Sequence, residues 1–544
     1  MKKAKSLLSI LLALSMVLCM AACGSKNAES GDASSTASNS ATDSTETATD
    51  TSSDGEKVFV YGADANCTTF DPYNDLQNKS GNFLLHAVGD TLWNVDADGN
   101  MVYRLATNVE WTDDLTMKVT LREGVKFSNG NDFNAEDVLY TLQLLYDTPR
   151  TLSMVSNIDL DNTVALSDYE VSIAFTKYDA AFTDAMGNPS FFMLDKESYE
   201  ADPDHKWIIG TGPYKLKGDG ETDTSGWEES VQYTLVRNEN YWGEAPYYDT
   251  LIVRFFSEES TRYAELQAGN LDAAYFSEAT YIKDVNAGAL SGFNLVQTEM
   301  PNVRGFAMAI SDRTRGTFSD INIRKAFAHG MDITSMVEVV GDGVYKVADS
   351  ILSSSSWAYL QTGTYEYDPE YAAECLAEAG YSVDNPLTIE LVCENNALYS
   401  SIAETAQAYL SQIGINLDLT GVGDYSTILP SLIAADFDVC IDGAYNGSGA
   451  DPANSLQKMG PLSNTASLAV MDEDISQLFL DALSSNSIEE RTELYHQFQQ
   501  AVYDGYYFIP MWVETSNFAV SDAHSSFASC IDTSGNFDPT KLVD

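Results

Sequence analysis

One stretch in the second half of the chain alternates between strand and helix patterns, and this constrains the fold more than any other feature. Apolar residues alternate at 387–393, which predicts a strand, and then recur at helical spacing over 402–413. A strand (415–419), a helix (425–434) and another strand (437–441) follow. The order strand–helix–strand–helix–strand predicts a wound α/β layer whose ligand lies beyond the carboxyl ends of the strands.

The chain between residues 57 and 300 does not alternate in this way; its predicted short strands occur in clusters. Strands are predicted at 57–61, 118–121, 125–127, 231–236 and 251–255, and helices at 82–93 and 260–268. Asn134 is predicted to cap a further helix, with Asp137 three residues on completing a capping box. The alternating pattern begins after Pro301. A strand is predicted at 304–310, followed by helices at 320–329, at 333–340 and from Pro369 onward.

The N-terminus carries an export signal. Lysines are followed by a nearly continuous apolar run over 7–20, which is shorter than the ~20 residues that span a bilayer. Met-Ala-Ala-Cys at 20–23 resembles a bacterial lipobox, which makes Cys23 the expected lipidation site; the alternative is an ordinary cleaved signal, and Cys19 is the competing cysteine. The Ser/Thr/Asp-rich segment to residue 56 has no large apolar residue, which predicts a flexible tether.

Charge and motif content exclude several classes of function. With 29 Lys and Arg against 81 Asp and Glu, the chain has a net charge of −52, so phosphate backbones repel it and nucleic-acid binding is not expected. The five cysteines after residue 57 include no C-x-x-C pair, and the histidines are scattered, so neither a metal site nor a cofactor is expected. G-x-S-x-G, H-E-x-x-H and P-loop patterns are absent from the sequence, so we expect no catalytic residues and no enzyme.

Four stretches together resemble one protein family. They are Leu-Arg-Glu-Gly-Val-Lys-Phe at 121–127 with the capped helix after Asn134, Gly-Thr-Gly-Pro-Tyr at 210–214, Arg-Asn-Glu-Asn-Tyr-Trp-Gly at 237–243, and Ile-Arg-Lys-Ala-Phe-Ala at 323–328. In this order, from Lys57 to about Val520, the chain resembles the extracellular solute-binding proteins of ABC importers, family 5, of the oligopeptide, dipeptide and nickel type.

The resemblance implies an α/β, two-lobed periplasmic-binding-protein-like fold (type II) with an extra subdomain inserted in the first lobe. The expected parts are a signal peptide at 1–22, the lipidated cysteine and tether at 23–56, a lobe I core of 57–105, 201–300 and 508–544, an inserted subdomain at 106–200, and a wound lobe II at 301–507. The alternating strand–helix pattern begins near 299–304 and ends near 505–512, and we expect the hinges at these two places.

The loop after the strand at 437–441 departs from the family pattern. Peptide-binding relatives carry a Gly-Trp…Asp segment there, and its Asp pairs with the α-amine of the peptide. This chain has Ala444 at the Trp position and Gly447 or Ser448 at the Asp position. Either Asp442 or Asp451 replaces the anchor from a shifted position, or the anchor is lost and the ligand is neutral, such as an oligosaccharide.

The remaining candidate ligand-binding residues each have a structural alternative. Tyr445, Asn446 and Ser448 follow the carboxyl end of a strand, where wound sheets place ligands, but they also suit a turn. Arg304 is a candidate partner for a carboxylate, or a surface salt bridge. Trp357 either stacks on the ligand or covers the lobe.

The function implied by the resemblance is that of a substrate-binding lipoprotein of an ABC importer. It captures an oligopeptide or dipeptide between two closing lobes and delivers it to the permease; the alternative is the same role with an oligosaccharide or other organic solute. The expected partners are the solute, the transmembrane permease subunits and, through the lipid, the outer face of the bacterial cytoplasmic membrane. A monomer is expected.

Overall fold

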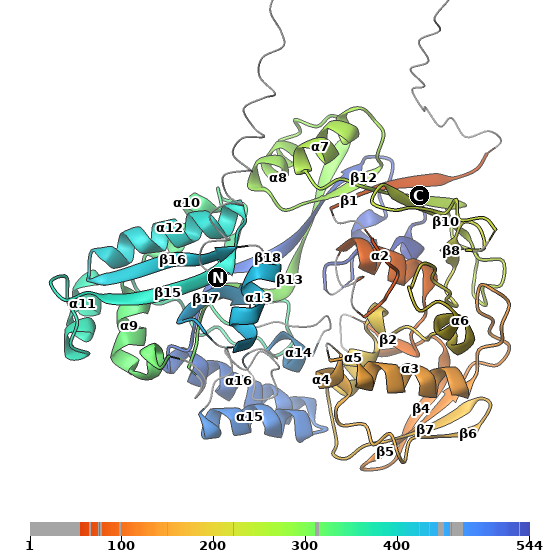
Figure 1. The fold of residues 1–544 in the computed structure, drawn as a ribbon, viewed down its shortest axis with the longest axis horizontal. Coiled ribbons are helices and arrows are strands. Elements are labelled where there is room, and N and C mark those ends of the chain that lie inside the picture. Colours follow the sequence, from red (N-terminus) through yellow and green to blue (C-terminus); the bar gives the residue numbers. More distant parts are fainter. Residues whose placement is uncertain are drawn as a thin grey trace, which may run out of the picture. The chain divides into compact units, whose positions relative to one another are not determined.

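A sheet of 12 strands runs through the described part of the chain, with two long antiparallel strands, β13 (Phe293–Met308) and β18 (Phe508–Ser521), at its centre (Figure 1). The computed structural model describes residues 55–544 except 65–66, 74–75, 77–78, 97–99, 150, 221, 311–314, 424, 435, 444–450, 457–458, 460–471 and 533. The strand order along the main path is β16-β15-β17-β13-β18-β12-β1-β11-β10-β8. The central pair therefore joins the strands on one side to those on the other.

The strands beyond β13 form the predicted wound layer. β15 (Leu387–Glu394) pairs in parallel with β16 (Ile415–Gly423) and with β17 (Val439–Gly443). The connections are α12 (Ala397–Ser411) and α13 (Tyr425–Ala434). Leu391 and Cys393 pack into one hydrophobic cluster and Val392 into another, so both faces of β15 are covered, as parallel sheets require.

Further helices complete this side of the sheet. They are α9 (Ile321–His329), α10 (Ile333–Val340), α11 (Pro369–Glu378), α14 (Pro452–Ser455), α15 (Glu473–Ser484) and α16 (Ile488–Asp504), with the short strand β14 (Lys346–Val347) and a 3₁₀ turn, η2 (Thr317–Ser319). The predicted start of α11 is confirmed, because the Asp368 side chain accepts a hydrogen bond from the amide of Tyr371 and Pro369 occupies the first turn.

On the other side of β18 lie the strands of the first part of the chain. They are β12 (Ala273–Phe276), β1 (Val58–Ala63), β11 (Thr250–Phe255), β10 (Gln232–Arg237), β9 (Trp227–Glu228) and β8 (Tyr214–Leu216), accompanied by α2 (Lys79–Val88), α6 (Lys196–Ala201), α7 (Glu259–Gln267) and α8 (Ala279–Asn286). β1 is parallel to both of its neighbours, β11 and β12. β18 pairs with β12 through 517–520, which places the C-terminal part of the chain on this side.

A separate four-stranded sheet lies within residues 106–174. Its strand order is β4 (Ala106–Asp113), β5 (Thr116–Leu121), β7 (Glu170–Ala174) and β6 (Val164–Ser167). The same part of the chain contains α3 (Ala135–Asp147), α4 (Leu152–Val155), α5 (Phe182–Met186) and η1 (Pro189–Phe191). It is preceded by the hairpin of β2 (Trp93–Val95) and β3 (Met101–Tyr103). The capping box of α3 is confirmed: Asn134 accepts from the amide of Glu136 at 2.8 Å, and Asp137 accepts from the amide of Asn134 at 3.0 Å.

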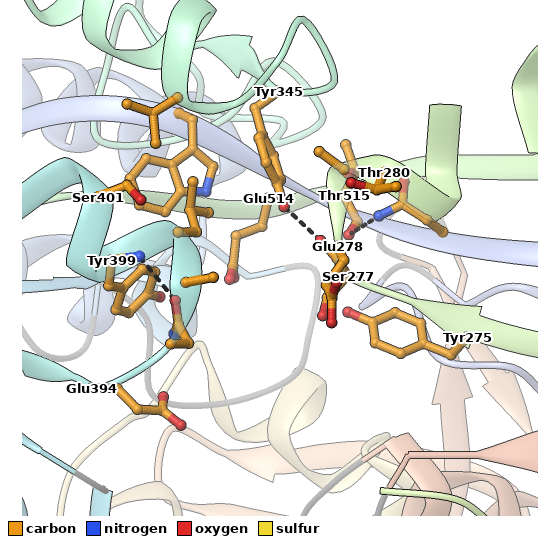
Figure 2. A pocket seen from close by; sticks show the side chains of 17 residues that line it. Tyr275, Ser277, Glu278, Thr280, Tyr345, Glu394, Tyr399, Ser401, Glu514 and Thr515 are labelled. Atoms are coloured by element: carbon orange, nitrogen blue, oxygen red, sulfur yellow. Dashed lines mark hydrogen bonds between the residues drawn. The ribbon is translucent and has the colours of Figure 1, made fainter. Parts of the chain in front are cut away.

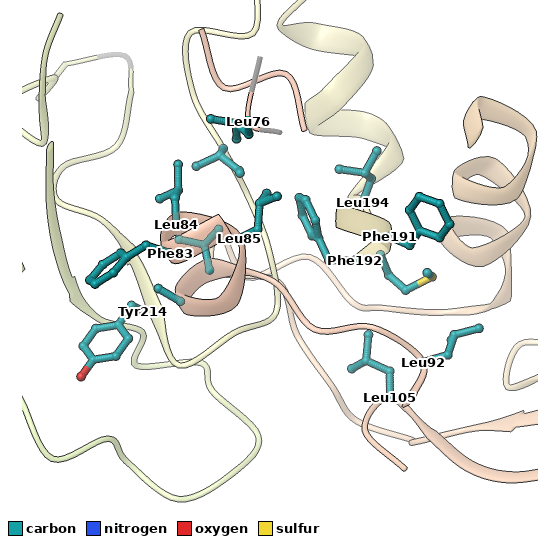
Figure 3. Packing of buried hydrophobic residues seen from close by; sticks show 14 of the residues in the cluster. Leu76, Phe83, Leu84, Leu85, Leu92, Leu105, Phe191, Phe192, Leu194 and Tyr214 are labelled. Atoms are coloured by element: carbon teal, nitrogen blue, oxygen red, sulfur yellow. The ribbon is translucent and has the colours of Figure 1, made fainter. Parts of the chain in front are cut away.

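Helix α2 packs at the centre of the largest hydrophobic cluster. Figure 3 shows its Phe83, Leu84 and Leu85 among the surrounding apolar side chains, which include Phe192 and Tyr214. A Cβ at Gly210 would collide with the carbonyl oxygen of Val88, at the end of α2. The first glycine of the 210–214 motif is therefore required by this close backbone approach.

The 237–243 motif is also structural. Trp242 donates from Nε1 to Asp90 Oδ2 at 2.8 Å, and the guanidinium of Arg122 lies 4.2 Å from the centroid of the Trp242 ring. Asp90 in turn forms an ion pair with Arg104 at 2.5 Å. The tryptophan thus ties the motif to the loop after α2.

Two predicted elements are wrong in extent. The helix expected over 82–93 ends at Val88, because the carbonyls of Thr91 and Leu92 accept hydrogen bonds from the backbone amides of 104–106 instead of from a continuing helix. The strand expected at 125–127 is reduced to a single bridge between Lys126 and Asp132, because a tight turn uses the neighbouring backbone groups. The five cysteines among the described residues are free and buried.

The C-terminal segment is attached to α2 through His86. His86 Nε2 lies 3.2 Å from Asp532 Oδ2, and its Nδ1 lies 4.0 Å from Asp538 Oδ2. Asp532 follows the turn η3 (Phe527–Cys530), and Asp538 precedes the turn η4 (Pro539–Lys541). Burial alone would lower the pKa of His86, but Asp538 and Asp532 outweigh it and raise that pKa above the ordinary value.

We expect this contact to make stability pH-dependent. Because the pKa of His86 is raised on folding, its contribution is fully present below the unfolded pKa of about 6.5 and is lost as pH rises through the folded pKa. His86→Gln should therefore lose stability relative to the parent at low pH, and the gap should narrow as pH rises. Urea unfolding over a pH series measures this.

The matched control is His496→Gln, since His496 lies on α16 and has no carboxylate partner among the described residues. It should follow the parent. A gap between His86→Gln and the parent that is constant with pH would contradict the assignment.

Candidate functional site

A pocket of about 500 Å³ lies where the carboxyl end of β15 faces the carboxyl end of β12 and strand β18. Its volume is in the range of small-molecule sites. The described lining residues come from four separate stretches of the chain: Tyr275, Ser277, Glu278, Ala279 and Thr280; Val340 and Tyr345; Glu394, Asn396, Ala397, Leu398, Tyr399 and Ser401; and Trp512, Glu514, Thr515 and Asn517.

Aromatic rings line the pocket from both halves of the sheet, on either side of the central β13–β18 pair. The Trp512 ring lies 5.7 Å from that of Tyr399 and 6.2 Å from that of Tyr345, and Tyr275 stands opposite (Figure 2). The Tyr345 hydroxyl donates to the carbonyl of Ser277 at 2.7 Å, a contact between the two sides. Tyr399 is placed by the first turn of α12, which Asn396 caps by accepting from the amide of Tyr399.

Arg304 forms an ion-pair cluster beside the pocket. Its Nη1 lies 2.8 Å from Asp442 Oδ1, and its Nε lies 2.8 Å from Glu514 Oε1. These residues stand on β13, β17 and β18, which are adjacent in the sheet. Burial alone would lower the pKa of Arg304, but Glu514 and Asp442 raise it well above the ordinary value, so the guanidinium stays charged.

Asp451 and Trp357 lie away from the pocket and contact the same arginine. Asp451 Oδ2 is 2.5 Å from Arg491 Nη2, its Oδ1 accepts from the amide of Ala453, and the Arg491 guanidinium lies 5.3 Å from the Trp357 ring. Both Asp451 and Arg491 are buried. These contacts hold α14 against α16.

The structure therefore brings together only part of the predicted site. Arg304 and Asp442 are neighbours that pair with each other, so each neutralises charge on the other. Tyr445, Asn446 and Ser448, as well as Cys23, lie outside the described residues.

None of the described residues that line the pocket was a candidate in the sequence analysis. Glu394 and Asn396 lie at the carboxyl end of β15. The rule that ligands lie beyond the carboxyl ends of strands, which selected the loop after β17, therefore applies to them as well. Tyr275 and Trp512 carried no such signal, because only the pairing of β12 and β18 places them at the pocket.

The fold and pocket define a mixed α/β binding protein with strands on both sides of a central antiparallel pair. The family model for bacterial extracellular solute-binding proteins, family 5 (middle region), matches residues 100–466. The glutathione-binding protein GsiB of Salmonella typhi is 26% identical over 508 residues, covering 89% of this chain and 94% of the relative.

Solved structures show the same fold. DppA from Helicobacter pylori in complex with the peptide STSA superposes with a TM-score of 0.76 at 20% identity, covering 89% of this chain and 97% of that one. NikA from Brucella suis in complex with Fe(III)-EDTA gives 0.76 at 23% identity, covering 90% and 99%.

This chain belongs to the family 5 bacterial extracellular solute-binding proteins. It captures a small solute outside the cytoplasm and works with the permease of an ABC importer; it is a transport protein and not an enzyme. Among the described residues, none of the helices has the length and apolar character needed to cross a bilayer.

The Arg304 cluster predicts a specific stability effect. Arg304→Met leaves Asp442 and Glu514 facing each other without their shared cation, which should cost about 2 kcal/mol or more at neutral pH. The deficit should shrink as pH falls through the carboxylate range, since protonation removes the repulsion. Thermal unfolding at neutral and acidic pH measures both effects.

Arg315→Met is the matched control. Arg315 also contacts several carboxylates, but its side chain is 39% exposed, so removing it should cost less than about 1 kcal/mol. Equal deficits for the two variants at every pH would show that the Arg304 cluster does not stabilise the central strands.

Proposed function

We propose that the solute is a peptide of a few residues. The observation that carries this proposal is the pocket itself, which combines aromatic faces for side chains with carboxylates and backbone groups for polar ends. Relatives with the same fold support it, since one is solved with the peptide STSA and another, from Pseudoalteromonas, with Met-Leu.

An oligosaccharide is the second candidate. Four aromatic rings, Tyr275, Tyr345, Tyr399 and Trp512, line the pocket, and such rings also suit the apolar faces of sugars.

We further propose that capture closes two lobes about hinges near 299–304 and 505–512, with lobe I formed by 57–105, 201–300 and 508–544, an inserted subdomain at 106–200, and lobe II at 301–507. The β13–β18 register shifts between Glu299 and Val303, which supports a flexible point there. Contacts that an open state would break also support it: Lys283 pairs with Asp342 at 2.6 Å, and Asn454 donates to Asp184 at 2.6 Å.

The proposed ligand class is tested by thermal shift of the chain from residue 57 onward. A ligand that binds only the folded state stabilises it by about 2.7 kcal/mol at a hundredfold excess over Kd. We expect short peptides to raise the melting temperature and oligosaccharides to leave it unchanged. A shift with oligosaccharides alone would overturn the peptide proposal.

We also propose that the mature chain is a monomer tethered through lipid on Cys23, with 1–22 removed and 23–56 as the tether. Cys23→Ala should move the protein from the membrane fraction to the soluble fraction, because it removes the thiol that carries the lipid. Cys19→Ala is the matched control and should stay with the membrane. Retention of Cys23→Ala in membranes would contradict the anchor.

A further inference from the structure

We propose that this pocket recognises a cationic group in addition to the α-ammonium that every peptide carries, so that peptides with Lys or Arg side chains are preferred. The inference rests on the proposed function, since it assumes that this pocket is the ligand site, and it names the ligand chemistry that the pocket recognises.

The first support is the charge of the lining. Three carboxylates, Glu278, Glu394 and Glu514, line the pocket, and the lining residues that the structure describes include no Lys, Arg or His. Figure 2 shows Glu394 on the side of Tyr399 and Glu278 on the side of Tyr275, with Glu514 between them. An anionic group placed against these three carboxylates would meet like charge, whereas a cationic group would be attracted.

The second support is that the neighbouring cation does not neutralise these carboxylates. Arg304 pairs with Glu514 and Asp442, and it forms no ion pair with Glu278 or Glu394. In the part of the chain that the structure describes, the carboxylates of Glu278 and Glu394 have no ion-pair partner. Burial, together with Glu259, raises the pKa of Glu278, and a bound cation would relieve this unfavourable environment.

The third support is the aromatic lining. The rings of Trp512 and Tyr399 are tilted against each other with centroids 5.7 Å apart, Tyr345 adjoins Trp512, and Tyr275 lines the opposite side. The negative faces of such rings attract ammonium groups, above all where water is partly excluded. Aromatic rings combined with carboxylates are the chemistry that recognises organic cations.

A further polar atom is available to the ligand. Thr515 Oγ1 lines the pocket, is buried, and has no hydrogen-bond partner among the described residues. A buried hydroxyl without a partner is costly, and an N–H donor from the ligand would satisfy it.

The predicted amine anchors do not serve this purpose. Asp442 pairs with Arg304 and Asp451 with Arg491, and neither carboxylate is among the described residues that line the pocket. We therefore place the cation site at Glu278, which directly precedes α8, and at Glu394, the last residue of β15.

The test uses the chain from residue 57 onward and an equimolar pool of tripeptides, with the captured peptides identified by mass spectrometry. We expect enrichment of peptides containing Lys or Arg. For the tripeptide Ala-Lys-Ala, acetylation of both amines should weaken binding by about 5- to 30-fold, the range for a partly desolvated cation contact. Glu278→Gln and Glu394→Gln should each reduce this ratio while leaving the acetylated peptide unaffected.

Glu404→Gln is the matched control, because Glu404 lies on α12 but is exposed and outside the pocket. Capture of tripeptides without regard to charge, with no effect of the two glutamine variants, would overturn this inference and leave the proposed function standing. Binding of choline but of no peptide would overturn the peptide proposal and uphold ammonium selection. Binding of neither would overturn both.

Discussion

The pairing of β13 with β18 is the constraint on which the rest of the structure depends. These strands pair with each other from residue 293 to 308, and each also pairs with strands of one side, β17 or β12. Every other strand of the main sheet connects through them. Arg304 stands within this pair and links β13, β17 and β18 by two ion pairs, so charge as well as backbone hydrogen bonding holds the junction.

This arrangement decides which acidic residues remain available to a solute. A cation next to a carboxylate stabilises its ionised form and reduces its attraction for a second cation. Arg304 pairs with Asp442 and Arg491 with Asp451, whereas Glu278 and Glu394 form no ion pair within the described part of the chain. In a chain of net charge −52, the scarce cations therefore determine where negative charge is left unpaired.

Much of the fold could be predicted from local pattern. The wound layer, the capping box at Asn134 and the start of α11 at Pro369 depend on residues close in sequence, and the structure confirms them. The helix over 82–93 was predicted too long, because the backbone at 91–92 is bonded to the distant residues 104–106. The candidate pocket was not predicted: the expectation of ligands beyond strand ends was applied to the loop after β17 and not to Glu394 at the end of β15, and nothing local marked Tyr275 or Trp512.

The sequence by itself determined the alternation of strands and helices, the acidic charge and the family motifs, because periodicity, capping and glycine requirements act over a few residues. Only the tertiary structure decided which carboxylates are paired and which rings share a pocket. Glu278, Glu394 and Glu514 are separated by more than a hundred residues each, and the pairing of β18 with β12 and β13 brings their stretches together. Ion pairing depends on distance in space, and that distance exists only after the long-range strands have paired.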